Sequence, residues 1–213
     1  MQLTKKTIDV LKNFAGINQG ILIKEGDVIK TTSQLKHIVA IAKVDNEFTK
    51  EFAIYNLPEF LSTLSMFNNP DIKFNDKYME MNKDAAKAKY YYSPANVIVT
   101  PPNKEFKAPP PDLTFHLSKD VFASILKASG IMRLEEVKID KNGITIFNSN
   151  STGNQYEIEL PVDEITEGAS AIVKVENLKM IETDYNVSVS TKGVASFVSV
   201  DGDLEYHVQI QVA

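Results

Sequence analysis

Lysine is the charged residue whose placement in this chain is most regular. Lys5 and Lys12 lie near the start of the chain, and Lys119 and Lys127 lie just past its midpoint. On an α-helix each pair would share one face, with the members about 10–12 Å apart at a rise of about 1.5 Å per residue. Positive groups spaced in this way attract the phosphates of a nucleic acid without reading its bases. The first chemistry to consider is therefore electrostatic binding to a polyanion.

The two lysine pairs belong to segments that read alike, LTKKTIDVLKNFAGI at 3–17 and LSKDVFASILKASGI at 117–131. Thr4 and Ser118 are predicted to be their N-caps, because a hydroxyl at that position accepts a hydrogen bond from a free amide of the first turn. Apolar residues recur at helical spacing and predict one buried face on each helix. These residues are Ile8, Val10, Leu11, Phe14, Ala15 and Ile17 in the first segment, and Val121, Phe122, Ile125 and Leu126 in the second. The lysines fall on the opposite faces.

The two helices are the first elements of an internal repeat. Three further pairs of segments follow in the same order: a strand–turn–strand unit at 21–30 and 137–147, a strand leading into a short helix at 52–65 and 170–182, and a strand meander at 72–93 and 186–212. Alternation in Tyr206, Val208 and Ile210 is typical of a half-buried strand. The pattern predicts an α+β fold of two similar domains, residues 1–99 and 113–213, each with two helices packed on antiparallel sheet.

The residues between the two halves, TPPNKEFKAPPPD at 100–112, include five prolines among thirteen residues. Proline lacks the amide donor and fixes φ, so this segment is expected to be extended and poor at pairing with a strand. The prediction is a stiff connector between the domains.

The charge balance limits how the chain could use its lysines. The 213 residues include 23 Lys and Arg against 28 Asp and Glu, a net charge of −5. A nucleic-acid-binding protein is usually basic overall, because phosphate contacts supply most of its affinity. This chain must therefore either avoid nucleic acid or confine its positive charge to one surface. A lysine on the solvent face of a helix ordinarily only keeps it hydrated, but repetition at matched positions in an acidic chain favours a surface that faces phosphate.

The sequence offers little that could carry out catalysis. It has no cysteine, which excludes disulfides, thiolate metal sites and a cysteine nucleophile. His37, His116 and His207 are far apart and lack a partner at metal-ligand spacing, and no nucleotide-binding or hydrolase motif occurs. The segment Asp201-Gly202-Asp203 is more typical of a hairpin turn than of a cation site. We expect no enzyme activity, no cofactor and no metal, and no apolar run is long enough to span a membrane.

Two stretches, LTKKTIDVLKNFAGINQGILIKEG at the start and FAIYNLPEFLSTLSMFNN at 52–69, resemble the sliding clamp (DNA polymerase processivity factor) of T-even-type tailed bacteriophages. The resemblance extends over the whole chain in its two-domain order, and is closest in these stretches. It implies two similar DNA-clamp domains and a closed ring of six domains, hence a homotrimer. In such rings the helices face the central hole, and the sheets continue across subunit boundaries.

The resemblance also implies sites, partners and a location. The residues that would face DNA are Lys5, Lys6, Lys12, Lys119, Lys127 and Arg133, with Lys174 and Lys179 from the fourth helix. Partner proteins would dock beside the connector, near Phe106, Pro109, Pro110 and Pro111. The implied partners are encircled double-stranded DNA, a DNA polymerase, a clamp loader ATPase and late-transcription factors, all in the cytoplasm of the bacterial host.

A different class of protein shares most of these signals. A non-enzymatic structural or assembly protein of a virion could have the same two domains, with sheets that pack edge to edge. Such a protein has no use for paired lysines on its helices. The alternative therefore stays open, and the lysines distinguish it from a clamp.

Overall fold

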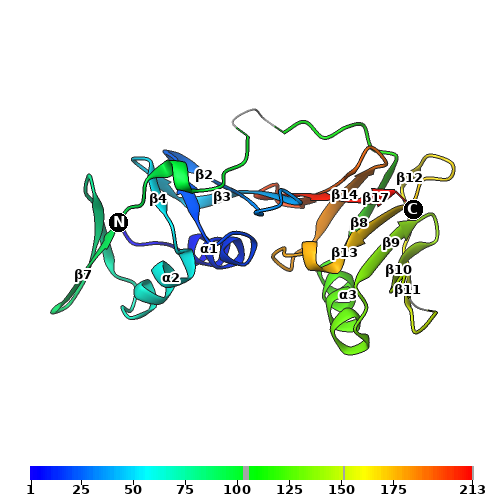
Figure 1. Cartoon of the computed structure of the whole chain (residues 1–213), viewed down its shortest axis with the longest axis horizontal. Coiled ribbons are helices and arrows are strands. Elements are labelled where there is room, and N and C mark those ends of the chain that lie inside the picture. The colour runs from blue at the N-terminus through cyan, green and yellow to red at the C-terminus, as the bar shows by residue number, and fades with distance from the viewer. Residues whose placement is uncertain (103–105, 151, 213) are drawn as a thin grey trace. The chain divides into compact units, whose positions relative to one another are not determined.

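The computed structural model describes residues 1–102, 106–150 and 152–212. The chain divides into two compact units, Met1–Pro101 and Pro102–Ala213. Their boundary lies inside the proline-rich segment 100–112 (Figure 1). Each unit has its own helices, antiparallel strands and core, which confirms the predicted α+β class.

Unit 1 consists of two α-helices, seven strands and a short 3-10 helix. In chain order these are α1 (Lys5–Ile17), β1 (Ile21–Ile23), β2 (Gly26–Thr32), β3 (Ile38–Phe48), β4 (Phe52–Ile54), α2 (Leu57–Ser65), β5 (Asp71–Phe74), β6 (Tyr78–Lys83), β7 (Ala86–Tyr91) and η1 (Ala95–Val97). Strand β1 pairs with β4 and β2 pairs with β3, while β5, β6 and β7 form a three-stranded meander in that order. The strand–turn–strand unit predicted at 21–30 therefore contains both strands, but each finds its partner elsewhere.

In its described residues, unit 2 repeats the plan with ten strands and one α-helix. The elements are β8 (Leu113–Leu117), α3 (Lys119–Met132), β9 (Glu136–Asp140), β10 (Gly143–Phe147), β11 (Tyr156–Glu159), β12 (Glu164–Ile165), β13 (Ala171–Lys174), the 3-10 helix η2 (Val175–Asn177), β14 (Tyr185–Ser190), β15 (Val194–Ser199), β16 (Leu204–Gln209) and β17 (Gln211–Val212). One sheet has the order β11-β10-β9-β13-β17, and β12, β8, β14, β15 and β16 neighbour one another in a second. The predicted hairpin at 137–147 is confirmed, because β9 pairs directly with β10.

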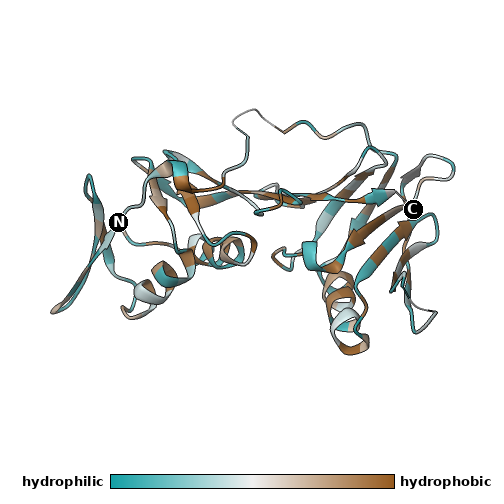
Figure 2. Ribbon diagram, in the orientation of Figure 1, coloured by the Kyte–Doolittle hydropathy of each residue, from teal (hydrophilic) through white to brown (hydrophobic). Residues whose placement is uncertain are grey.

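The apolar face of each long helix is buried against the strands of its own unit. On α1 the buried apolar residues are Val10, Leu11, Phe14 and Ile17, and on α3 they include Phe122 and Ile125. Figure 2 shows hydrophobic residues along the helices and strands within each unit. The core of unit 1 is formed by Leu3, Leu11, Ile23, Phe48, Phe52, Ile54, Phe60, Ile72 and Met79, and that of unit 2 by Phe115, Leu117, Phe122, Ile125, Val137, Ile139, Ile144, Val173, Leu178 and Phe197.

The second helix predicted for each domain is present only in unit 1. There Asn56 caps α2, accepting a bond from the Glu59 amide at 3.1 Å, and Pro58 fits the first turn. In unit 2 the matching residues 170–182 form β13 and then only the 3-10 helix η2 in place of an α-helix. Lys174, which precedes η2, has no side-chain acceptor for a cap. Because the first turn of a helix is costly to form, a segment without a cap stops at a single 3-10 turn.

Gly143, the first residue of β10, allows strand β11 to lie close to β10. Its φ is +116°, and a Cβ built there would lie 2.3 Å from the carbonyl oxygen of Ile158 and 2.7 Å from the amide of Leu160. An L-residue cannot take this position without strain, and β11 would be pushed off β10.

Gly143→Ala should therefore destabilise the protein by about 1–3 kcal/mol, the range expected for backbone strain at such a position. Gly130→Ala is the matched control, because Gly130 lies in α3 with open space around its Cα and should tolerate alanine. Urea unfolding of the two variants measures the difference. Equal midpoints would show that β11 is not held in this way.

Candidate nucleic-acid interface

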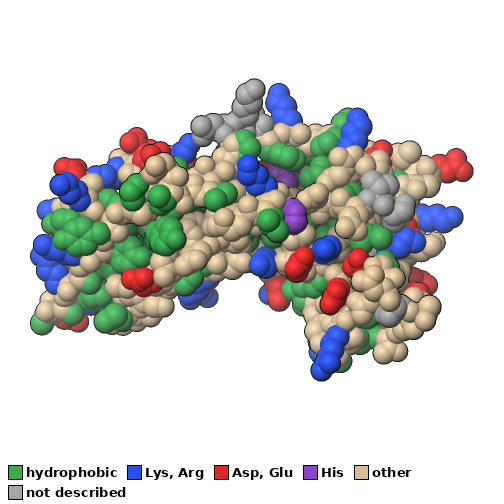
Figure 3. Space-filling view, viewed as in Figure 1, with side chains coloured by type: hydrophobic (Ala, Val, Ile, Leu, Met, Phe, Trp, Pro, Cys, Tyr) green, Lys and Arg blue, Asp and Glu red, His purple; other side chains and the backbone are tan. Residues whose placement is uncertain are grey.

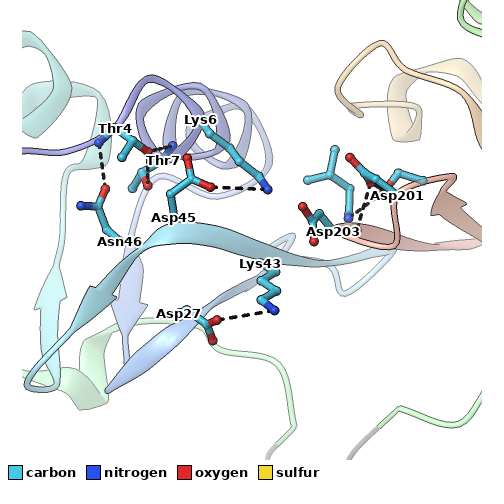
Figure 4. Close-up of polar contacts among 11 residues, drawn as sticks. Thr4, Lys6, Thr7, Asp27, Lys43, Asp45, Asn46, Asp201 and Asp203 are labelled. Atoms are coloured by element: carbon cyan, nitrogen blue, oxygen red, sulfur yellow. Dashed lines mark hydrogen bonds and ion pairs between the residues drawn. The ribbon is translucent and has the colours of Figure 1, made fainter.

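Helix α1 presents its lysines from an anchored N-terminus. Thr4 caps the helix as predicted, accepting a bond from the Thr7 amide at 3.2 Å. The amide of Thr4 in turn donates to Oδ1 of Asn46 at 2.8 Å, and Asn46 is buried in β3 (Figure 4). Lys5 and Lys12 are exposed on the face away from the core.

Lys6 has a different environment from its neighbour. Its Nζ lies 3.8 Å from Oδ1 of Asp45 on β3, and its side chain is 35% exposed. Figure 4 shows it reaching from α1 toward this strand. Lys6 is therefore tied to the sheet, whereas Lys5 and Lys12 are exposed to solvent.

Helix α3 repeats the arrangement in unit 2. Ser118 caps it as predicted, accepting from the Val121 amide at 3.3 Å, and the amide of Lys119 donates to Oδ1 of Asp184 at 2.7 Å. Lys119 and Lys127 are exposed. Arg133 ends the helix in the left-handed conformation, at φ 56°, and is exposed as well.

The positions of Lys5 and Lys6 oppose the stability of helix α1. The N-terminus of a helix carries partial positive charge, so acidic side chains are favoured there and basic ones are disfavoured. Helix α1 has Lys5 and Lys6 in its first turn and no acidic residue. Their charge adds to the helix dipole, which makes the N-terminus of α1 a centre of positive potential suited to phosphate.

Lys174 and Lys179 do not lie on an α-helix, and their assignment to a fourth helix is wrong. Lys174 is the last residue of β13, with its Nζ 4.0 Å from Oε1 of Glu176, and Lys179 follows η2. Both are exposed. The neighbouring Glu176 and Glu182 leave this segment without the excess of positive charge found on α1 and α3.

The connector meets unit 2 through one aromatic contact. The ring of Phe106 lies 4.0 Å from that of His207, centroid to centroid, while Pro110 and Pro111 are exposed and Pro109 is half-buried. His207 on β16 is only 4% exposed, and its Nδ1 is 2.9 Å from Oγ of Ser196. The predicted partner site thus divides into a docked phenylalanine and a proline run. Residues 103–105 of the connector are outside the described chain.

Burial lowers the pKa of His207 below its ordinary value of 6.5, and the nearby Glu205 carboxylate opposes this with a smaller effect. Nε2 of His207 is 2.9 Å from Oε1 of Glu205 but lacks the geometry of a hydrogen bond. The imidazole is therefore held neutral, because its desolvation exceeds the attraction of one half-exposed carboxylate.

Several residues that position the interface gave no signal in the sequence. Asn46, Asp45 and Asp184 are distant in sequence from the helices that they contact. A local pattern cannot show such contacts. In the part of the chain that the structure describes, no group of three His, Cys, Asp or Glu side chains could hold a metal ion, and no helix is long and apolar enough to cross a membrane.

Comparison with known proteins decides what these two units are. Residues 3–98 match the family described as DNA polymerase processivity factor. The sliding clamp of Vibrio phage KVP40 is 31% identical over 221 residues, which cover 98% of both chains. The chain belongs to the sliding clamp family. The clamps of Enterobacteria phage T4 and Escherichia phage RB69 are each 26% identical, over 95% and 88% of this chain and 93% and 86% of their own.

Solved structures agree on the fold at much lower sequence identity. A PCNA of A. fulgidus, bound to the C-terminal region of FEN-1, has a TM-score of 0.68 at 11% identity and covers 97% of this chain and 94% of its own. The DNA polymerase III subunit beta of Pseudomonas aeruginosa has a TM-score of 0.67 at 10% identity. The similarity covers 99% of this chain and 63% of that bacterial chain. The family membership sets aside the alternative of a virion structural protein.

The contact of Phe106 with His207 predicts a measurable titration. Phe106→Ala should readmit water to the imidazole and raise the pKa of His207 toward 6.5, since burial is the main cause of its depression. NMR titration of the ring protons reports the change, with Pro110→Ala as the control. In the wild type, folding favours the neutral ring, so His207 contributes stability at high pH that is lost as pH falls below 6.5. An unchanged pKa in Phe106→Ala would mean that the connector does not cover this histidine.

Proposed function

We propose that three copies of this chain close into a ring around duplex DNA and tether the replicative DNA polymerase to its template. The observation that carries the proposal is the matched display of exposed lysines on α1 and α3, one helix from each unit. Family membership as a DNA polymerase processivity factor supports the same function. A chain of two clamp domains needs three copies to supply the six domains of a ring, and a head-to-tail contact that closes is a permitted symmetry.

The proposed DNA-facing set is centred on the two helices. It contains Lys5, Lys6, Lys12, Lys119, Lys127 and Arg133, with Lys174 and Lys179 as peripheral members beside acidic residues. A ring holds DNA by enclosing it, so these groups need only attract phosphate weakly and without regard to sequence. Lysine suits this task because its charge sits on a flexible stem and does not form the fixed two-pronged contact of arginine.

The other proposed roles depend on enclosure of DNA by the ring and require no catalytic residue in this chain. It acts without catalysis, so opening and closing of the ring fall to a clamp loader ATPase. The connector around Phe106, Pro109, Pro110 and Pro111 is the proposed docking region for the polymerase and for late-transcription factors. All these events belong in the cytoplasm of the bacterial host.

Reversal of one lysine in each unit tests the DNA-facing surface. Lys12→Glu with Lys127→Glu should leave the oligomer intact and lower loader-dependent stimulation of polymerase on long templates by about tenfold or more, because six phosphate contacts per ring become repulsive. The control is Lys73→Glu with Lys141→Glu, which makes the same charge change on exposed positions of β5 and the β9–β10 turn. Processivity that survives the first pair and not the second would remove these helices from the hole.

Binding to open-ended DNA should be weak. The net charge of −5 opposes free association, and enclosure is absent on a short linear duplex. Fluorescence anisotropy at increasing salt should show low affinity that falls steeply with ionic strength. Tight binding at physiological salt would contradict retention by enclosure.

A further inference from the structure

Asp9 lies on the exposed face of α1 that carries Lys5 and Lys12. The three residues follow one another at spacings of four and three, and all three are exposed. Residues at these spacings are neighbours on the surface of a helix, with Cβ atoms about 5–6 Å apart. A negative group therefore lies between two positive ones, on the surface that would meet phosphate.

The fold gives no reason for an acid at this position. Helix α1 begins at Lys5, so Asp9 is past the first turn, where the attraction of a carboxylate to the helix dipole has faded. In the part of the chain that the structure describes, the Asp9 carboxylate takes part in no hydrogen bond and no ion pair. Aspartate is also a poorer residue for the interior of a helix than alanine, lysine or glutamate. Helix stability therefore does not explain Asp9.

Exposed carboxylates are common elsewhere on this protein. The chain has 28 Asp and Glu, and acidic and basic side chains lie intermixed over much of the surface in view in Figure 3. An acid beside a lysine is ordinary on the sheets and loops. On a helix face that would attract DNA, the same acid lowers the attraction, so the position of Asp9 has a consequence for binding.

The internal repeat supplies a comparison. Asp9 follows Lys5 by four residues, and at the matching place in unit 2 Ala123 follows Lys119 by four. Helix α3 also has an acid, Asp120, but this residue is in the first turn, where the helix dipole favours it. The two helices therefore differ in where they carry an aspartate. In α3 it stabilises the helix, and in α1 it is exposed between lysines.

The acid is on the helix with the stronger positive potential. The first turn of α1 has Lys5 and Lys6 and no acidic residue, so both lysines add to the positive end of the helix dipole. In α3 the carboxylate of Asp120 offsets part of the same potential. Because binding strength grows with each phosphate neutralised, α1 without Asp9 would hold DNA more tightly than α3.

We propose that Asp9 limits the attraction of α1 for the DNA backbone, so that an enclosed duplex can move through the ring. The inference rests on the proposed function and concerns the strength of its DNA contact. A phosphate that approaches Lys5 and Lys12 also approaches Asp9, whose charge repels it. In a ring of three copies this repulsion occurs three times around the hole. Asp9 lowers the affinity where the lysines and the helix dipole together would make it highest.

Removal of the charge at Asp9 tests the proposal. Asp9→Asn should raise the affinity for a short linear duplex about threefold or more at low salt and steepen its fall with salt concentration, because more phosphates are neutralised. The matched control is Asp71→Asn, the same chemical change at an exposed position of β5. Fluorescence anisotropy with a labelled duplex over a range of salt measures both quantities. An equal rise in the control, or no rise in Asp9→Asn, would overturn the proposal.

Transfer of the aspartate to α3 gives the reciprocal test. Ala123→Asp places an acid between Lys119 and Lys127 and should lower the affinity for the same duplex by a similar factor. The double variant Asp9→Asn/Ala123→Asp keeps the net charge of the wild type, and its affinity should return toward the wild-type value. If the half-buried Ala123 does not accept aspartate, Asp9→Asn alone decides.

Urea unfolding separates binding from stability. Asp9→Asn should unfold at the same urea concentration as the wild type, because the Asp9 carboxylate makes no contact that the fold would lose. A lower midpoint in Asp9→Asn together with an unchanged DNA affinity would show that the residue is structural, and would contradict the proposal.

Movement on DNA tests the consequence for the ring. The diffusion of labelled, loader-assembled rings along a stretched duplex should slow about twofold or more in Asp9→Asn, relative to the wild type and Asp71→Asn, since tighter phosphate contacts retard sliding. Equal diffusion of all three, with processivity lost in Lys12→Glu/Lys127→Glu, would overturn the role of Asp9 and keep the clamp function. Processivity retained in that lysine variant would defeat the DNA-facing surface itself, and this proposal with it.

Discussion

The central physical constraint on this molecule is that positive charge must be held rigidly at places where the helix itself disfavours it. Lys5 and Lys6 occupy the first turn of α1, which has no acidic residue to offset them. The helix stays in place because its buried face packs on the strands and its start is tied to Asn46. An amide left without a partner at such a site would cost about 1–3 kcal/mol, so the tether is comparable with the penalty it must overcome.

In the proposed ring, contacts to DNA and contacts between subunits need different strengths. Strong or specific contacts to DNA would stop such a ring from sliding, so the exposed lysines of α1 and α3 suit a DNA-facing surface. In the proposed ring, the subunit contacts must persist while the contacts to DNA stay weak. The negative net charge is compatible with this proposal, because most acidic residues lie outside the two helices and would repel DNA from the remaining surface.

Local patterns in the sequence predicted the parts of this fold that are fixed locally. Thr4 and Ser118 could be recognised as caps, and the apolar spacing of α1 and α3 located their buried faces, because both signals lie within a few residues. The failure at 170–182 has the same cause. Its apolar pattern matches that of α2, but Lys174 cannot cap, and Leu178 and Met180 are buried without a helix. Asp45, Asp184 and the docking of Phe106 on His207 depend on tertiary contacts, which no local window contains.

Strand β7 shows how charged side chains can stabilise a strand at the edge of a sheet. Within the chain, Lys87 pairs with Glu80 across β6 and β7, so the meander is stable before any partner arrives. The same side chain remains 55% exposed and can share its charge with a second carboxylate. In a head-to-tail ring, the number of copies that close depends on the angle between the two contact surfaces of one copy. Lysines on an edge strand also discourage unspecific pairing with other strands, because charged side chains make a free edge a poor template.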